Sequence, residues 1–286
     1  MKISEILQSD KITLSFEVFP PKKAENFSAV RTAAEQIASL HPSFMSVTYG
    51  AGGSTAGYTA ELAAAIENND HVTVMPHLTC VGCSREQADA MIERYHASGI
   101  DNIMVLRGDK PTEGPAQNDF AHASDLIAYI KKHSDLCVGG ACYPEGHPES
   151  YNKKEDLDYL KQKVDAGCDF LTTQMFFDNN IFYNFLYRAR EAGIQVPILA
   201  GIMPITNGRQ LDRSVSLSGT NVPETFRAIV DCFKDNPDAM KQAGIVYAAD
   251  QIIDLIANGV RHIHVYSMNK PDVAAGILNN LSEILK

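Results

Sequence analysis

Residues Leu14–Pro21 read LSFEVFPP, an apolar stretch that holds one carboxylate, Glu17, and ends in two prolines. Valine and phenylalanine in such a run are typical of a β-strand. Pro20 and Pro21 follow the strand directly, whereas the first strand of a doubly wound nucleotide-binding sheet usually leads into a glycine-rich loop. A charge removed from water must be paired or neutralised. The stretch therefore favours a barrel and marks Glu17 as a candidate functional group.

The same unit, a short β-rich run followed by a helical pattern, recurs along the chain. We expect strands at Thr13–Phe19, Phe44–Tyr49, Val72–His77, Asn102–Leu106, Leu136–Cys142, Phe170–Gln174, Val196–Ala200 and His262–Tyr266. Amphipathic stretches lie between them, at Ala29–Leu40, Ala60–Glu67, Arg85–Ala97, Ser124–His133, Lys154–Ala166 and Ile181–Ala192. Several end in a glycine typical of helix C-termini, as at Gly99, Gly167, Gly193 and Gly259.

Eight such units in 286 residues predict an α/β fold, a (β/α)8 TIM barrel. The chain has no linker rich in serine and glycine, so we expect residues 1–286 to form a single domain. Ser216–Asn236 is interpreted as an added loop and helix, and the long stretch Ala239–Ala257 as the lead into the eighth strand.

Composition narrows the functional classes. The formal charge of −10 argues against general nucleic-acid binding. No run of about 18 apolar residues indicates a membrane span, and the polar start MKISEILQSDK lacks the apolar core of a signal peptide. Six cysteines in a chain this long do not form a disulfide scaffold. We therefore expect a cytoplasmic protein with reduced thiols.

Alternation along the first strand predicts which side chains face the barrel interior. Leu14, Phe16 and Val18 form the face that packs on helices, which directs Ser15 and Glu17 inward. Other polar residues also gather where strands end, namely Thr48, Tyr49, His77, Arg107, Gly108, Asp109, Tyr143, His147, Gln174, Tyr266, Asn269 and Lys270. Barrel enzymes carry their active sites at this end of the strands. The residues predict an enzyme with a carboxylate acid or base and a roomy polar mouth.

Each of these residues alone has a structural explanation. A strand glutamate is often an ion-paired rim residue, and His77 alone is typical of a hydrogen-bonded core histidine. His77, Cys80 and Cys83 together spell H-x-x-C-x-x-C, part of a zinc pattern that lacks a second ligand pair. We interpret the two cysteines as loop thiols on the site face. A metal-dependent barrel lyase or hydrolase remains the alternative, because the residues themselves name no substrate.

Eight short motifs in order resemble the methylenetetrahydrofolate reductase family. They are LSFEVFPPK, FMSVTYGAGGS, PHLTC, LRGD, YPEGHPE, KVDAGCDFLTTQMFFD, GIMPI and HVYSMNK, and they run from about Thr13 to Lys270. The length is similar to that of the bacterial type, a catalytic barrel alone. The resemblance implies a (β/α)8 barrel that holds FAD. NADH or NADPH reduces the flavin and leaves, and 5,10-methylenetetrahydrofolate is then reduced to 5-methyltetrahydrofolate in a ping-pong sequence.

The resemblance also implies partners. Some members act as the catalytic subunit of a complex that receives electrons through an iron–sulfur partner, which is the alternative to a nicotinamide donor. A homo-oligomer is expected, since flavin barrels of this kind often associate.

The resemblance assigns roles to individual residues. Glu17 is similar to the general acid that protonates N10 of the folate, opening the ring to an N5 iminium ion that flavin N5 reduces. Asp109 is similar to the family's residue near flavin and pterin. The residues that resemble cofactor contacts are Thr48, Tyr49, Ala51, His77, Arg107, Gly108, Asp109, Ala123, Tyr143, His147, Asp156 and Lys163. The residues that resemble folate-side contacts are Glu17, Thr48, Asp109, Gln174, Gln210 and Lys270.

Two expectations qualify this assignment. A mostly apolar barrel mouth should raise the pKa of Glu17 so that it can donate a proton near neutral pH. The chain also departs from the family pattern, since Tyr159 and Gln162 stand where some relatives carry polar or basic cofactor contacts, and Ser214 stands where some carry a phenylalanine over the ligand.

Overall fold

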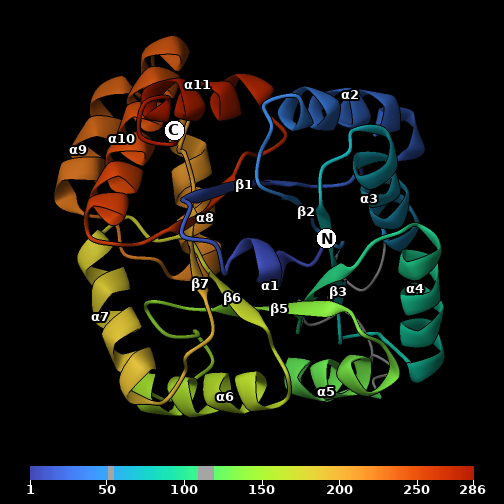
Figure 1. The fold of residues 1–286 in the computed structure, drawn as a ribbon. Coiled ribbons are helices and arrows are strands. Elements are labelled where there is room, and N and C mark those ends of the chain that lie inside the picture. The colour runs from blue at the N-terminus through green and yellow to red at the C-terminus, as the bar shows by residue number, and fades with distance from the viewer. Residues whose placement is uncertain (51–54, 109–118) are drawn as a thin grey trace.

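The computed structural model describes residues 1–50, 55–108 and 119–286. Within this part of the chain, parallel strands β1 to β8 pair in sequence order and close into a barrel (Figure 1). Their bounds are β1 Thr13–Val18, β2 Met45–Val47, β3 Val74–Thr79, β4 Asn102–Leu106, β5 Cys137–Cys142, β6 Phe170–Thr173, β7 Ile198–Ile202 and β8 His262–Tyr266. The prediction of a (β/α)8 barrel is confirmed, although β2 is shorter than expected.

Helices connect the strands and surround the barrel (Figure 1). Their bounds are α1 Ile3–Ile6, α2 Phe27–Ala38, α3 Ala56–Asn69, α4 Arg85–Ala97, α5 Ala123–His133, α6 Lys153–Asp165, α7 Asn179–Glu191, α8 Gly208–Ser218, α9 Glu224–Phe233, α10 Pro237–Ala257 and α11 Pro271–Leu281, with a 3-10 turn at Ala24–Asn26. None of the helices in the described ranges is long and apolar enough to cross a membrane.

Local sequence sets the helix ends. Ser84 begins α4, because its hydroxyl accepts a hydrogen bond from the backbone N–H of Gln87 while the Gln87 side chain accepts one from the N–H of Ser84. The helix ends before Gly99, whose φ of 72° suits glycine. Both ends of α4 match the predicted range. The added helix expected within Ser216–Asn236 is α9.

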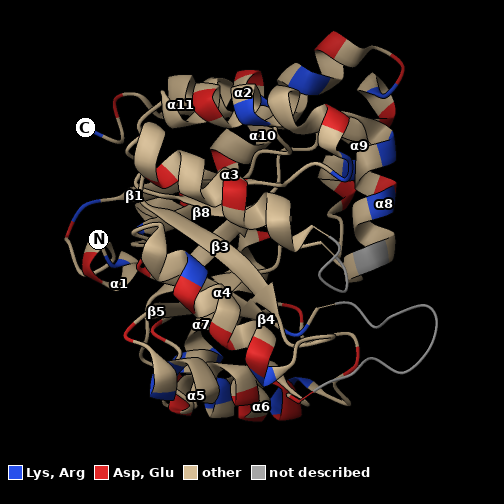
Figure 2. Ribbon diagram, turned by 90° about the vertical axis from the view of Figure 1, so that its right-hand side faces the viewer, with Lys and Arg blue, Asp and Glu red and all other residues tan. Residues whose placement is uncertain are grey.

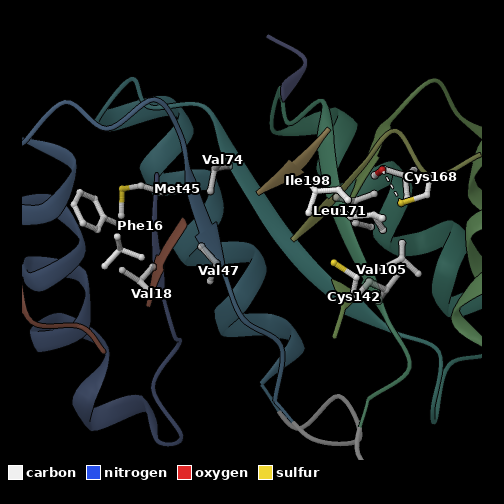
Figure 3. Close-up of a cluster of buried hydrophobic side chains, with 14 of the residues drawn as sticks. Phe16, Val18, Met45, Val47, Val74, Val105, Cys142, Cys168, Leu171 and Ile198 are labelled. Atoms are coloured by element: carbon white, nitrogen blue, oxygen red, sulfur yellow. Dashed lines mark hydrogen bonds between the residues drawn. The ribbon is translucent and has the colours of Figure 1, made fainter. Parts of the chain in front are cut away.

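The outward faces of the strands make the larger apolar core. Leu14, Phe16 and Val18 are buried there against the surrounding helices, as the alternation along β1 predicts. Figure 3 shows Phe16 and Val18 beside Met45 and Val47 in this layer. The other face of β1 is thereby left to point into the barrel.

An apolar plug closes the barrel at the N-terminal ends of its strands. The plug consists of the buried side chains Ile3, Leu7, Phe44, Met75, Met104, Cys137, Phe170 and Leu199. The backbone N–H of Ile3 donates to Oδ1 of the buried Asn102 at 2.7 Å, which fixes α1 across this end. Figure 2 shows α1 and the N-terminus at one end of the barrel and α8 and α9 at the other. A site inside the barrel must therefore open toward α8.

A third apolar cluster holds α8, α9 and α10 at the C-terminal end. The rings of Phe226 and Tyr247 stack with centroids 3.9 Å apart, and Phe177 lies 5.1 Å from Phe226. A Cβ on Gly244 would lie 1.8 Å from the carbonyl oxygen of Ile205, so α10 approaches the loop after β7 as closely as glycine allows. This packing fixes α8 beside the barrel mouth.

Candidate active site

Glu17 lies inside the barrel mouth, as predicted, and its carboxylate meets three side chains from three other strands. Its Oε2 atom is 3.4 Å from Oγ of Ser46 on β2, 3.5 Å from Nε2 of His77 on β3 and 3.8 Å from Nε2 of His264 on β8. The side chain keeps 20% of its surface exposed, whereas His77 keeps 6% and His264 keeps 1%. One carboxylate edge therefore faces a buried polar cluster, and the group remains accessible from the mouth.

The expected rise in the pKa of Glu17 is wrong. Burial raises the pKa of Glu17, but the nearby imidazoles of His264 and His77 lower it more, so the net shift is downward. The sequence argument assumed apolar surroundings, and the two imidazoles were not part of it. With a lowered pKa, the carboxylate is ionised near neutral pH.

His77 behaves differently from its neighbour. Its Nε2 atom is buried and has no hydrogen-bond partner among the described residues, although it points at Glu17. Burial lowers the pKa of His77 to about 4, against the opposing effect of the Glu17 charge. His77 is therefore neutral at pH 7 and offers an unsatisfied nitrogen at the mouth.

A cavity of about 790 Å³ lies at the same end of the barrel, lined by residues that follow the strands, such as Phe19 after β1 and Gln174 after β6. Five predicted residues line it, namely Arg107, Tyr143, His147, Gln174 and Gln210. Ser214, which stands where some relatives carry a phenylalanine over the ligand, also lines it. The sequence argument did not pick out the other lining residues, which are Phe19, Pro148, Glu149, Met175, Met203, Arg213, Ser218 and Met268. A volume of this size accommodates a cofactor-sized or drug-sized ligand.

Arg107 and Glu149 form an ion pair at the edge of the cavity. The guanidinium donates from both terminal nitrogens to the carboxylate, at 2.8 and 3.1 Å. The hydrogen bond to Glu149 raises the pKa of Arg107. Nearby, the ring of His147 meets Tyr143 edge-on at 4.7 Å, and burial together with the Arg107 charge lowers the pKa of His147. This side of the mouth presents a fixed cation and a neutral imidazole.

The opposite side of the mouth presents amides and an amine. Lys270 donates to the hydroxyl of Thr206 at 2.7 Å, and that hydroxyl donates to Oε1 of Gln210 at 3.2 Å. The side-chain oxygen of Gln174 accepts from the N–H of Met175 at 3.0 Å, which leaves its amide nitrogen to face the cavity residues. Gln174, Gln210 and Lys270 therefore gather at the mouth, as predicted.

Gly108, which follows β4, requires glycine. Its φ is 85°, and a Cβ there would lie 2.8 Å from Cβ of Thr79. The positive φ and the close approach of Thr79 together explain why glycine follows Arg107 here.

The remaining predicted residues are more dispersed. Thr48 lines a second cavity, of about 920 Å³, and Tyr49 is half-buried with a pKa raised by burial. Lys163 donates to the carbonyl of Ala141, and burial lowers its pKa. Ala123, Asp156 and Lys163 do not line the mouth cavity, nor do Tyr159 and Gln162. Ala51 and Asp109 lie outside the described residues.

Cys80 and Cys83 lie in the tight loop after β3, and both are buried. The N–H of Cys83 donates to the carbonyl of Cys80 at 3.1 Å, and burial raises the pKa of Cys83 to about 11. Within the described ranges no group of three or more His, Cys, Asp and Glu side chains is arranged to hold a metal ion. The alternative of a metal-dependent barrel enzyme gains no support from this part of the chain.

The sequence argument missed Ser46 and His264. Both are inward residues of their strands, and His264 alternates with His262 and Tyr266 in the run HIHVY. Applying the two-residue period of strands to β8, as was done for β1, would have found it.

Similarity to known proteins agrees with these observations. The profile of the family described as Methylenetetrahydrofolate reductase matches residues 2–282. The chain belongs to this family. It is 34% identical over 271 residues to 5,10-methylenetetrahydrofolate reductase from Pectobacterium carotovorum subsp. carotovorum, covering 95% of this chain and 90% of that protein. It is 37% identical over 302 residues to Methylenetetrahydrofolate reductase (NADH) 1 from Arabidopsis thaliana, covering 99% of this chain.

The extent of these matches differs between relatives of the methylenetetrahydrofolate reductase family. The chain spans about half the length of the plant relatives that it matches, 50% in the Arabidopsis protein. Among solved structures, it superimposes with a TM-score of 0.69 and 16% identity on an uncharacterised protein from Clostridium thermocellum that binds two copies of 5-methyl-5,6,7,8-tetrahydrofolic acid. That match covers 100% of this chain and 99% of the other, and at this identity it shows the fold alone.

Proposed function

We propose that the protein reduces 5,10-methylenetetrahydrofolate to 5-methyltetrahydrofolate, with FAD as its cofactor and a reduced nicotinamide as the electron source. The observation that carries the proposal is the position of Glu17. It is a carboxylate that keeps 20% of its surface exposed inside the barrel, two residues before Phe19, which lines a cavity of about 790 Å³, in a chain of the methylenetetrahydrofolate reductase family. The name of the Arabidopsis relative specifies NADH, which makes NADH the first donor to test.

The residues present fit a flavin dinucleotide. Arg107 supplies a guanidinium for an anionic phosphate. Gly108 follows Arg107 directly and carries no side chain, and the buried Nε2 of His77 has no partner of its own within the described ranges. These three residues would hold parts of FAD, with Tyr143 and His147 along the same side of the mouth. When bound, FAD supplies the two-electron transfer between the nicotinamide and the folate carbon.

Glu17 provides the proton that the folate needs. In the substrate a carbon bridges N5 and N10, and breaking its bond to N10 leaves the bonding electron pair on N10. A proton delivered to N10 by Glu17 neutralises that charge, and the bridging carbon becomes an iminium ion that accepts a hydride equivalent. Binding of the folate removes water from the carboxylate, which favours the neutral, proton-donating form.

Gln174, Gln210 and Lys270 form the folate side of the site. The amide of Gln174 can donate and accept hydrogen bonds at once, which matches the mixed donors and acceptors of a pterin ring. Lys270 and Gln210 are held by Thr206 and would contact the remainder of the folate. These residues orient the substrate so that N10 faces Glu17.

Anaerobic half-reactions of the purified protein test the proposal. We expect a yellow protein whose flavin absorbance bleaches on addition of NADH or NADPH and returns on addition of 5,10-methylenetetrahydrofolate. A protein without bound flavin, or a reduced flavin that folate does not reoxidise, would overturn the proposal. Bleaching by a chemical reductant but by neither nicotinamide, followed by reoxidation with folate, would replace the nicotinamide with a partner that delivers electrons.

A further inference from the structure

The loop after β8 forms a tight turn at the barrel mouth. The backbone N–H of Lys270 donates to the carbonyl of Ser267 at 3.0 Å, which closes the turn over Met268 and Asn269. Both central residues have a positive φ, 55° for Met268 and 53° for Asn269. Turns of this kind usually carry glycine, asparagine or aspartate at both central positions, so Asn269 suits its place and Met268 does not. An unfavourable backbone at a residue that lines the mouth cavity points to a functional reason for Met268.

Asn269 ties this turn to the segment that follows β1. Its side-chain oxygen accepts from the backbone N–H of Phe19 at 2.9 Å, and its side-chain nitrogen donates to the carbonyl of Phe19, also at 2.9 Å. One amide thus satisfies both backbone groups of Phe19, and we call this pair of hydrogen bonds the Asn269 clamp. Ser267 adds a third link, since its hydroxyl donates to the carbonyl of Glu17 at 2.6 Å. The turn therefore fixes the backbone of both Glu17 and Phe19.

The Asn269 clamp connects two exposed apolar side chains. Phe19 keeps 39% of its surface exposed and Met268 keeps 38%, and both line the cavity of about 790 Å³. The other rings that line this cavity, Tyr143 and His147, contact each other edge-on. Apolar and aromatic side chains that line a cavity provide the contact surface for the apolar part of a ligand. Phe19 and Met268 therefore offer such a surface on the side of the mouth where β1 and β8 end.

The chemistry of the substrate indicates which of its parts would lie there. In 5,10-methylenetetrahydrofolate, N10 is bonded directly to the aromatic ring of the p-aminobenzoyl group, and the proposed function places N10 at the Glu17 carboxylate. Phe19 follows Glu17 by two residues. Residues two apart in an extended chain lie about 6.6 Å from each other and face the same side. A ring attached to N10 would therefore reach the side chain of Phe19.

We propose that Asn269 is a positioning residue for the folate substrate, because it holds Phe19 and Met268 so that the ring bonded to N10 packs against them. The proposal rests on the proposed function. The amide of Asn269 is engaged by Phe19, so its effect on the substrate passes through the two apolar side chains. Reduction does not alter the ring, and contact with it contributes equally before and after the reaction. Loss of the Asn269 clamp should therefore weaken binding more than it lowers the limiting rate.

Equilibrium binding of two ligands tests the role of the ring. The probes are 5-methyltetrahydropteroate and the corresponding 5-methyl-6-methyltetrahydropterin, which lacks the p-aminobenzoate group. Each is titrated into the flavin-loaded protein while the flavin absorbance is followed. Asn269→Gly removes the clamp but still allows a positive φ. We expect its dissociation constant for the pteroate to rise about tenfold, and that for the pterin to change less than about twofold.

A double-mutant cycle shows whether Asn269 acts through Phe19. Phe19→Ala removes the ring and should itself weaken binding of the pteroate about tenfold. If Asn269 acts by holding Phe19, adding Asn269→Gly to Phe19→Ala should cost less than about threefold more. Effects that simply multiply in the double variant would overturn the proposal. Equal losses of pteroate and pterin affinity in Asn269→Gly would overturn it as well.

Two further variants separate the clamp from general damage. Asn269→Asp keeps an acceptor for the N–H of Phe19 but sets a second oxygen against its carbonyl. It should weaken pteroate binding as Asn269→Gly does, and it replaces that variant if Asn269→Gly does not fold. Asn68→Ala is the matched control, because it removes two hydrogen bonds of the same kind, from the amide of the exposed Asn68 to the carbonyls of Ala64 and Ser98. A loss in Asn68→Ala equal to that in the Asn269 variants would assign the effect to general destabilisation and refute the clamp.

Failure of the proposed function and failure of the clamp give different results. An unmodified protein that binds no flavin, or whose reduced flavin 5,10-methylenetetrahydrofolate does not reoxidise, contradicts the proposed function itself. An unmodified protein that does both, together with unaltered pteroate affinity in a folded Asn269→Gly or Asn269→Asp variant, refutes the role of Asn269 alone.

Discussion

The same strands give the barrel interior an apolar end and a polar end. On β3, Met75 belongs to the apolar plug and His77 to the polar cluster at the mouth, and only one residue separates them. Phe44 and Ser46 show the same change around β2. A shift of two residues along the inward face thus takes the interior from dry packing to a titratable cluster.

This difference means that the plug residues mainly stabilise the fold, whereas the mouth residues mainly serve binding and catalysis. Side chains of the plug are apolar apart from Cys137, whose Sγ accepts from the N–H of Ser4, so their main contribution to stability is burial of apolar surface. Those at the mouth hold charge or unsatisfied hydrogen-bonding groups, which cost stability unless a ligand uses them. Substitutions in the plug should therefore lower the free energy of unfolding, whereas substitutions at the mouth should lower catalytic rates or ligand affinity.

The largest effect is expected at Glu17. Glu17→Gln keeps the size of the side chain and removes its acidic proton, so flavin reoxidation by 5,10-methylenetetrahydrofolate should slow by about 10²–10⁴-fold. Flavin reduction by the nicotinamide should persist, since that half-reaction needs no proton on N10. Stopped-flow absorbance measures both steps separately. Loss of both half-reactions, or of neither, would contradict the assigned role.

Substitutions in the plug should lower stability and leave catalysis nearly unchanged. Phe170 is fully buried, and Phe170→Ala should lower the free energy of unfolding by about 3–5 kcal/mol through lost burial and a cavity. Urea denaturation monitored by circular dichroism measures the change, and Phe170→Leu, which keeps most of the volume, should cost less. Both half-reactions per folded molecule should stay within about twofold of the unmodified protein. A catalytic loss as large as that of Glu17→Gln would contradict the prediction that the plug contributes to stability and not to catalysis.

Protonation of His77 should make the free energy of unfolding depend on pH. Its pKa is lowered from 6.5 to about 4, so the unfolded chain binds a proton at pH values where the folded chain does not. The free energy of unfolding should therefore fall by roughly 3 kcal/mol as pH drops from about 6.5 to about 4. The lowered pKa of Glu17 acts in the same direction, but below the ordinary carboxyl range.

Replacing His77 measures how much of the pH dependence of the unfolding free energy comes from this residue. In His77→Gln the decline between pH 6.5 and 5 should become shallower, with the remainder supplied by His147 and His262, whose pKa values are also lowered by burial, whereas the exposed His41→Gln should leave the full decline. Urea midpoints measured at a fixed FAD concentration report both. An unchanged slope in His77→Gln would assign the pH dependence to other groups.

The fold could be predicted because each part of it has a local signal. Period-two alternation in LSFEVFPP predicted which side chains of β1 face the barrel interior, and Gly99 marked the C-terminal end of α4. The position of Glu17 followed from the same alternation. Its pKa did not, because the groups that set it, Ser46, His77 and His264, come from three other strands and meet Glu17 only when the barrel closes.

The composition of the mouth was predicted less completely than its location. Gln174 and Arg107 line the cavity as expected, since each follows a strand directly. Glu149 and Arg213 were missed because a loop and the helix α8 bring them there, and strand periodicity does not apply to either. Cavity residues that come from loops and helices can therefore be identified only from the tertiary structure, even where those at strand ends can be predicted from sequence.

Arg107 gives the smallest expected effect and the sharpest division between binding and stability. Its pair with Glu149 is partly exposed, so Arg107→Ala should change the free energy of unfolding by less than about 1 kcal/mol. Loss of a charged hydrogen-bond donor to an anionic ligand should weaken FAD binding by about 10- to 100-fold. Fluorescence titration of flavin-depleted protein measures the affinity. The exposed pair Lys241–Asp272, at 2.8 Å on α10 and α11, provides the control Lys241→Ala, which should change neither quantity. A destabilisation by Arg107→Ala as large as that of Phe170→Ala would mean that the mouth supports the fold as well as the ligand.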